Sequence, residues 1–301
     1  MCSGTELSEL YRCPYTASPI RDFLDARYAR IGTIDFGLLE GADYVLKECR
    51  RCGLIFQEQI PDEELSEVVY ERWADPEKAY LHKEKRALAG RGRNALEVMS
   101  IVDFFGRKPE DLRLLDFGMG WGFWVRIARA FGCQAYGLEV SASRVEHARE
   151  QGVEMLTPDR LDEYEFDFIN TEQVFEHLPR PFETAVELAG RLRDGGVLKI
   201  SVPNGMRVKR RLRNPDWTAA YGSARSLKDV SPLQHINCFT HRTLLRLGHR
   251  AGLRPVDIPA RLRYRYIPTW ERPTRLVKRT VGQHYRAVRR QSTNVWFRRA
   301  S

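Results

Sequence analysis

The sequence predicts an α/β fold: a doubly wound, mostly parallel seven-stranded sheet with helices on both faces. Three observations support this prediction. From residue 112 onward, short apolar runs alternate with amphipathic segments. A glycine-rich turn joins the first apolar run to the segment after it, and an acidic residue stands at the end of each of the first two runs. Strands that alternate with helices are typical of βαβ units, whose strands run parallel.

The expected elements follow one another along the chain. Strands are expected at 113–117, 134–139, 153–156, 166–170, 197–202, 254–258 and 294–298, and helices at 123–131, 141–151, 182–192 and 240–251. A further helical segment is expected at 79–105, with Gly90 and Gly92 interrupting it, because glycine disfavours helix interiors.

Composition divides the chain into three expected parts. Residues 1–62 form a small cysteine-containing module, residues 63–110 a helical connector, and residues 111–301 the α/β domain, with insertions at 204–234 and 260–291. A length of 301 residues suits one large domain or two. The first insertion follows the fifth strand, at the edge where open α/β sheets bind their ligands.

The turn after the first strand is built to hold a polar ligand. Asp116 is followed by Gly118, Gly120 and Gly122, and then by a helix. Glycine accepts positive φ and lets a ligand approach the main chain without a Cβ in the way. The helix N-terminus adds free N–H groups. The alternative is a glycine turn without a ligand.

The spacing of the glycines separates two classes of cofactor. A dinucleotide-binding site typically has the pattern G-x-G-x-x-G. Here Phe123 occupies the position of its third glycine. Glu139 closes the second strand, where an acid can accept hydrogen bonds from ribose hydroxyls. The pattern D-x-G-x-G-x-G with this second acid resembles the class I S-adenosylmethionine-dependent methyltransferases. An NAD-dependent oxidoreductase is the less favoured alternative.

This resemblance implies a Rossmann-like sheet, S-adenosylmethionine as cofactor and methyl transfer as the activity. It also implies a set of cofactor-binding residues at the carboxyl ends of the first, second and fourth strands: Asp116, Gly118, Gly120, Gly122, Glu139, Thr171 and Glu172.

Two histidines are the candidate catalytic residues. The segment 171–181, with Glu176 and His177, resembles the segment after the fourth strand in the same family, and His235 lies in a similar His-bearing segment before a late helix. A hydroxyl acceptor must lose its proton, and a positioned histidine can take it. The alternative is that His177 only orders its loop. Glu176 is a further candidate for the base.

The cysteines suggest a degenerate zinc knuckle. Cys49 and Cys52 form a C-x2-C pair followed by glycine, which is a common half of a tetrahedral zinc site. Cys13 precedes them, but Thr16 stands where its partner would be expected. The stretch resembles the N-terminal zinc module of some sugar-modifying methyltransferases with a ligand lost. A structural zinc and a metal-free relic both stay open.

The charge is concentrated at the C-terminus. The net charge is +9, and residues 261–301 hold 12 Lys and Arg against one acid. A second basic run spans 207–213, and an amphipathic basic helix is expected at 274–290. Such clusters can contact phosphorylated substrates, anionic membrane surfaces or nucleic acid, or can be simply solvated. No apolar run approaches a membrane span, and a cytoplasmic location is expected from free cysteines without a secretion signal.

The sequence thus favours O-methylation of a saccharide-like or other small-molecule hydroxyl, with a glycan or phosphorylated acceptor suited to the basic segments. An RNA-binding methyltransferase or a nucleic-acid-binding protein is the alternative. It ranks lower because the tail lacks the regular aromatic residues of a single-strand binding platform.

Overall fold

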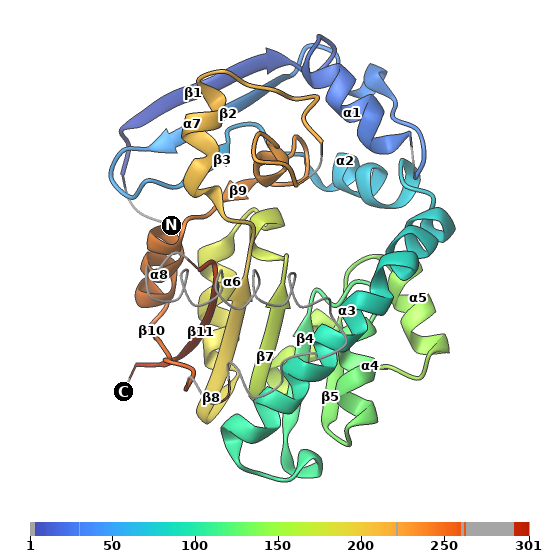
Figure 1. Cartoon of the computed structure of the whole chain (residues 1–301), viewed down its shortest axis with the longest axis vertical. Coiled ribbons are helices and arrows are strands. Elements are labelled where there is room, and N and C mark those ends of the chain that lie inside the picture. Colours follow the sequence, from blue (N-terminus) through green and yellow to red (C-terminus); the bar gives the residue numbers. More distant parts are fainter. Residues whose placement is uncertain (1–3, 30, 221, 260–261, 263–291, 301) are drawn as a thin grey trace. The chain divides into compact units, whose positions relative to one another are not determined.

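The computed structural model describes residues 4–29, 31–220, 222–259, 262 and 292–300 (Figure 1). The chain forms two compact units. Within the described residues, the first unit takes in the chain up to residue 83 together with 173–181 and 202–247. The second takes in 84–172, 182–201 and the chain from residue 248 on.

The second unit contains a seven-stranded sheet in the order β10-β11-β8-β7-β4-β5-β6. The strands from β6 to β8 run parallel, β11 is antiparallel to β8, and β10 is antiparallel to β11. This confirms the predicted fold class. The strands are β4 (Arg113–Phe117), β5 (Gln134–Leu138), β6 (Glu154–Met155), β7 (Phe166–Glu172), β8 (Leu192–Ser201), β10 (Leu253–Pro255) and β11 (Asn294–Arg299).

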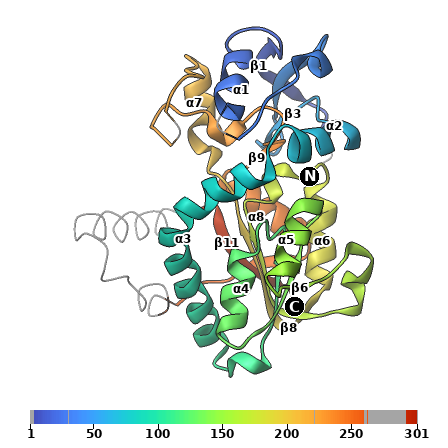
Figure 2. The same ribbon diagram turned by 90° about the vertical axis from the view of Figure 1, so that its right-hand side faces the viewer.

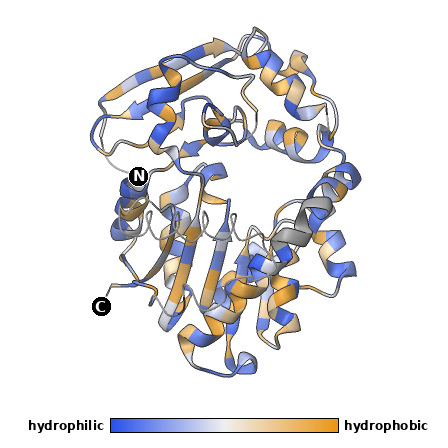
Figure 3. Cartoon of the chain, viewed as in Figure 1, coloured by the Kyte–Doolittle hydropathy of each residue, from blue (hydrophilic) through white to orange (hydrophobic). Residues whose placement is uncertain are grey.

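Helices cover both faces of this sheet, as Figure 2 shows for α3 and α4 on one side and α6 on the other. On the first face, the indole of Trp124 stacks on Phe168 with ring centroids 6.3 Å apart. Hydrophobic residues are concentrated along the strands (Figure 3). The helices of this unit are α4 (Phe123–Ala130) and α5 (Ala142–Glu150), with most of α3 (Pro76–Phe105) and α6 (Pro181–Gly190). A further helix, α8 (His241–Arg250), lies mostly in the part of the chain that belongs to the first unit.

The long helix α3 continues through Gly90 and Gly92, so the expected interruption is wrong. A glycine in a helix interior costs about 1 kcal/mol relative to alanine. Packing outweighs that cost, because Val98 and Ile101 on the same helix are fully buried in the core against the sheet.

The first unit is built on a four-stranded antiparallel sheet in the order β1-β2-β3-β9. Its strands are β1 (Leu7–Pro14), β2 (Asp43–Cys49), β3 (Ile55–Gln57) and β9 (Asn237–Cys238), and its short helices are α1 (Ile20–Tyr28), α2 (Glu63–Glu67) and α7 (Val208–Leu212). The sheet therefore takes its last strand from a segment far along the chain.

The segment 204–234, expected as an insertion of the α/β domain, packs into the core of the first unit. Trp217 lies against Tyr11, Phe23 and Tyr44, with ring centroids 5.3 to 5.6 Å apart. Val230 is fully buried in the same core. The first unit thus extends well beyond residue 62, where the sequence placed the end of a separate module.

The second expected insertion, 260–291, lies outside the described residues except for Leu262, and so does the basic helix expected at 274–290. Within the described part of the chain, no helix combines the length and apolar character that crossing a membrane requires.

Candidate active site

The glycine turn between β4 and α4 has the backbone that its sequence predicts. Gly118, Gly120 and Gly122 all have positive φ, at 69°, 59° and 71°. An L side chain is strained in this conformation, so the turn requires glycine at these positions. Gly122 is the N-cap residue of α4.

Glu139, directly after β5, ties this turn to the neighbouring strand. Its carboxylate accepts hydrogen bonds from the N–H groups of Gly120 at 2.8 Å, Val140 at 2.9 Å and Ser141 at 3.1 Å. A carboxylate offers about four acceptor positions. Three are used by these N–H groups, and Arg144 lies 3.8 Å from Oε2.

A row of three polar residues crosses the sheet beside the turn. Asp116 on β4 is paired in register with Asn170 on β7, and Asn170 with Lys199 on β8. The amide of Asn170 donates to Asp116 Oδ1 at 2.7 Å. Burial raises the pKa of Asp116 to about 7, although the hydrogen bond from Asn170 opposes the shift. Asp116 therefore bonds to the next strand rather than to the turn.

Lys199 is the buried cation of this row, with a residue exposure of 1%. Its ammonium lies 2.7 Å from Glu97 Oε1 on α3 and 2.9 Å from Glu172 Oε2 at the end of β7. Burial alone would lower the pKa of Lys199, but the carboxylates of Glu97 and Glu172 outweigh it and raise the pKa. The ion pairs connect α3 to the carboxyl edge of the sheet.

Thr171 and Glu172 belong to β7 itself, since the strand runs two residues further than expected. Thr171 is fully buried, and its hydroxyl donates to the carbonyl of Lys199 at 2.8 Å. This hydroxyl stabilises the sheet and is not available to a ligand. The side chain of Glu172 is 52% exposed and remains accessible.

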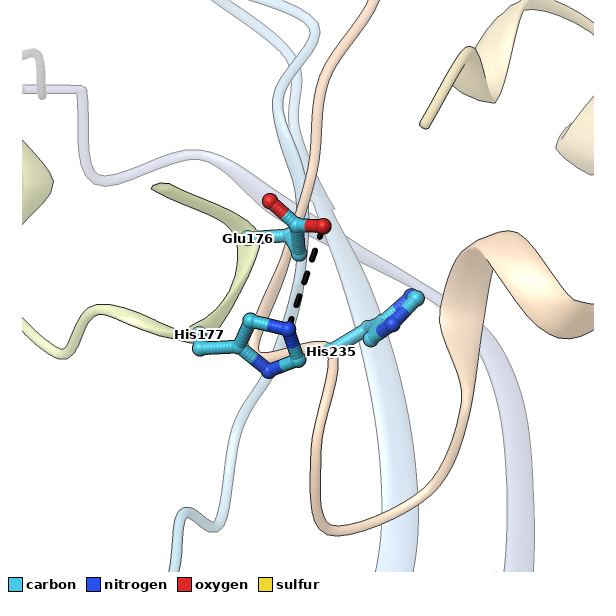
Figure 4. Close-up of side chains that lie close together, drawn as sticks. All are labelled: Glu176, His177 and His235. Atoms are coloured by element: carbon cyan, nitrogen blue, oxygen red, sulfur yellow. Dashed lines mark ion pairs between the residues drawn. The ribbon is translucent and has the colours of Figure 1, made fainter. Parts of the chain in front are cut away.

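The two candidate histidines lie together in the first unit, with Glu176 beside them (Figure 4). Glu176 and His177 come from the segment after β7, and His235 from the loop before β9. The imidazole rings of His177 and His235 meet edge to face with centroids 5.0 Å apart. Glu176, only 1% exposed, places Oε1 3.8 Å from His177 Nε2.

Hydrogen bonding fixes the tautomer of His177. Its Nδ1 lies 2.7 Å from the carbonyl oxygen of Gln234, which can only accept, so Nδ1 carries the proton. The hydroxyl of Tyr70 lies 3.2 Å from the same nitrogen. The lone pair of the neutral ring is therefore on Nε2, the nitrogen that faces Glu176.

His235 is neutral over the physiological range. Burial, together with the neighbouring His177 and Arg27, lowers its pKa to about 3. Its Nδ1 is buried and has no hydrogen-bond partner among the described residues. His235 is thus a weak base but an available nitrogen ligand.

Cys13 lies too far from the C-x2-C pair to complete a zinc site with it. In the β1–β2 pair, Leu7 lies opposite Cys49 while Cys13 lies opposite Tyr44. Cys13 is therefore five strand residues from Cys49, or about 17 Å at roughly 3.4 Å per residue. Such a distance is too long for one metal ion, so Cys13 cannot complete a site with Cys49 and Cys52.

The basic run 207–213 is partly used within the first unit. Arg211 pairs with Asp229 at 2.7 Å, and Lys209 with Glu48 at 2.7 Å. Arg207, Arg210 and Arg213 are exposed.

The sequence predicts the glycine turn, Glu139 and the histidines as candidate site residues, but it does not point to Glu97, Asn170 or Lys199. A charged residue within an apolar strand is a signal for the last of these, since buried lysines require a partner. Glu97 carries no comparable signal in the sequence, because a single acidic residue on a long helix is common and does not indicate a buried ion pair.

The sheet order, the glycine turn and the acid at the end of β5 fit the fold of a class I S-adenosylmethionine-dependent methyltransferase. Residues 81–258 match the family model described as "Methyltransferase domain", which covers more than half of the chain. The protein belongs to this family and is an S-adenosylmethionine-dependent methyltransferase. This result excludes the NAD-dependent alternative.

Known proteins agree with this assignment. The "Ubiquinone biosynthesis O-methyltransferase" of Maricaulis maris (strain MCS10) is 28% identical over 218 residues, which cover 65% of this chain and 81% of that protein. Among solved structures, the plantazolicin methyltransferase BamL, in complex with a triazolic desmethylPZN analog and SAH, has a TM-score of 0.51. It is 14% identical, and the match covers 79% of this chain and 95% of that one. This structural likeness supports the fold.

Proposed function

We propose that this methyltransferase methylates a hydroxyl oxygen of a small organic acceptor, with saccharide-like compounds as the leading class. The observation that carries the proposal is the tautomer of His177, whose Nε2 lone pair is set by the bond from Nδ1 to Gln234. An oxygen acceptor needs a proton acceptor. The O-methyltransferase relative at 28% identity supports the same kind of acceptor atom.

His177 is the proposed base, and His235 has a supporting role. Methyl transfer to a hydroxyl leaves a proton that a positioned histidine can take. The pKa of His235, at about 3, makes it a poor base. His177 follows Glu172, the last residue of β7, by five positions in the chain.

For the cofactor, we propose Gly118, Gly120 and Gly122 as backbone contacts and Glu139 as the ribose acceptor. S-adenosylmethionine supplies an activated methyl group. The amide oxygen of Asn170 is buried and accepts no hydrogen bond from the described residues. A positively charged ligand group would satisfy it, and the exposed carboxylate of Glu172 would attract the same charge. Asp116 supports this edge through Asn170.

A phosphorylated or glycan acceptor remains part of the proposal, because Arg207, Arg210 and Arg213 are exposed. Contact with a membrane surface or with nucleic acid depends on the tail, most of which lies outside the described residues.

The test is an acceptor screen that follows S-adenosylhomocysteine formation, with saccharides, phenols and primary amines as acceptors. We expect turnover with hydroxyl acceptors. With the best of them, His177→Gln should lower kcat by about 10²- to 10⁴-fold and leave the Kd for S-adenosylmethionine within twofold. His82→Gln, at an exposed histidine, is the matched control and should behave as wild type.

Turnover with amines alone would reject oxygen as the acceptor atom. If His177→Gln kept the wild-type kcat on a hydroxyl acceptor, His177 would not be the base.

A further inference from the structure

The cluster of Glu176, His177 and His235 has features that proton transfer alone does not require. Among the described residues it is the one group in which three or more side chains of metal-binding type place ligand atoms within 4.8 Å of one another. Two are imidazoles and one is a buried carboxylate (Figure 4). We propose that this cluster is a binding site for one divalent transition-metal ion of the zinc type.

The donor atoms suit such an ion. Two histidine nitrogens and one glutamate oxygen form a known ligand set for catalytic zinc, which keeps its fourth position open for water or substrate. Tetrahedral bonds of about 2.1 Å place neighbouring ligand atoms about 3.4 Å apart. His177 Nε2 and Glu176 Oε1 are already 3.8 Å apart, so movements of well under 1 Å would bring this pair to ligand distance.

The protonation of the ligands is also suitable. Metal-bound histidine must be neutral, and its second nitrogen usually donates to a carbonyl or carboxylate that orients the ring. His177 has this arrangement, because Nδ1 donates to the carbonyl of Gln234 and Nε2 is the nitrogen that faces Glu176. Nδ1 of His235 has no hydrogen-bond partner among the described residues, and its lone pair could coordinate the ion.

Positive charges nearby limit the affinity. Arg27 and Lys228 lie close enough to His235 to disfavour its protonation, and they disfavour a cation as well. Arg27 is held by a hydrogen bond to the side chain of Gln234. The single carboxylate of Glu176 offsets part of this charge. Neutral imidazoles bind zinc-type ions more strongly than Mg²⁺, which prefers oxygen ligands.

This inference connects with the proposed function but does not depend on it for its test. A proton and a metal ion compete for the same lone pair on His177. In the metal-free protein His177 would take the proton of the acceptor. In the loaded protein an acceptor hydroxyl at the open position would lose its proton more easily, as zinc-bound water does.

The experiment measures metal binding by the full chain, without methyl donor or acceptor. Protein stripped with a chelator is titrated with Co²⁺, and the visible ligand-field bands are recorded. We expect one equivalent of tetrahedral Co²⁺ without the near-ultraviolet charge-transfer absorption of a thiolate ligand. Zn²⁺ should displace it, and Mg²⁺ should not.

Variants locate the ion. His235→Gln and Glu176→Gln should each weaken Co²⁺ binding at least about tenfold, as even changes beyond the direct ligands do. His82→Gln and Cys52→Ser should bind as wild type. The wild-type spectrum keeps the test valid if a cluster variant does not fold.

Absence of stoichiometric binding by the wild type would overturn the proposal, as would a thiolate band or equal affinity in all variants. Failure of O-methylation with normal Co²⁺ binding would reject the proposed acceptor and leave the metal site standing.

Discussion

At the scale of single residues, burial decides what each carboxylate does. Asp116, Glu139 and Glu176 are all at least nine-tenths buried, yet their partners differ. Glu139 accepts hydrogen bonds from three backbone N–H groups. Asp116 receives one hydrogen bond from Asn170, but its burial favours the neutral form.

This difference gives a prediction for Asp116. Its pKa is about 7 in the folded chain and about 3.9 in an unfolded one. Between these values the native state binds more protons, so Asp116 makes the unfolding free energy fall as pH rises. Asp116→Asn keeps an oxygen acceptor for the amide of Asn170. Because the asparagine does not titrate, the variant lacks this decrease of the unfolding free energy with pH. Relative to wild type, the variant should gain roughly 1.4 kcal/mol per pH unit from about pH 4 to 7.

The measurement is urea unfolding of both proteins at several pH values. Since denatured chains and buried groups both relax, the full gain of about 4 kcal/mol is an upper bound. A constant difference between the two proteins across this window would contradict a raised pKa for Asp116.

At the scale of elements, Lys199 fixes helix α3 to the carboxyl edge of the sheet. Lys199→Met should destabilise the second unit by about 3 kcal/mol, because it leaves Glu97 and Glu172 without their shared cation. Both carboxylates are partly exposed to solvent. The expected loss of unfolding free energy is therefore at the low end of the range for breaking buried ion pairs. Urea unfolding measures it.

The chain offers a matched control in Lys209→Met. Lys209 also pairs with a glutamate at 2.7 Å, but its side chain is 56% exposed. Exposed pairs contribute about 0 to 1 kcal/mol. Equal losses in the two variants would show that burial of Lys199 does not matter. In a double variant with Glu97→Gln, the loss should be smaller than the sum of the single losses.

The sequence predicted the helices and strands better than the contacts between distant segments. Strand β4, the glycine turn and Glu139 were found because apolar runs, glycine spacing and acids have local causes. The extension of β7 through Thr171 and Glu172 was not predicted, because polar residues at the end of a strand are more typical of a loop. The ion pairs of Lys199 were missed because they join three distant segments. Periodicity carries no information about such pairing.

At the scale of the whole molecule, the first unit is assembled from separate parts of the chain. Composition suggested a boundary at residue 62, because the cysteines and the apolar segments before it look self-contained. The pairing of β3 with β9 and the burial of Trp217 and Val230 could not be read from local sequence. Contacts between remote segments are set by the three-dimensional core.

A prediction follows from this packing of distant segments into the first unit. Trp217→Ala removes a buried indole that touches Tyr11, Phe23 and Tyr44, and should destabilise the first unit by about 3–5 kcal/mol. Hydrogen exchange should show faster exchange in β1 and β2, which lie some 170 or more residues before the substitution. Strands β4 and β7 of the second unit should keep their protection, because units can open separately. Faster exchange confined to residues 204–234 would show instead that this segment is an accessory to a module that is complete without it.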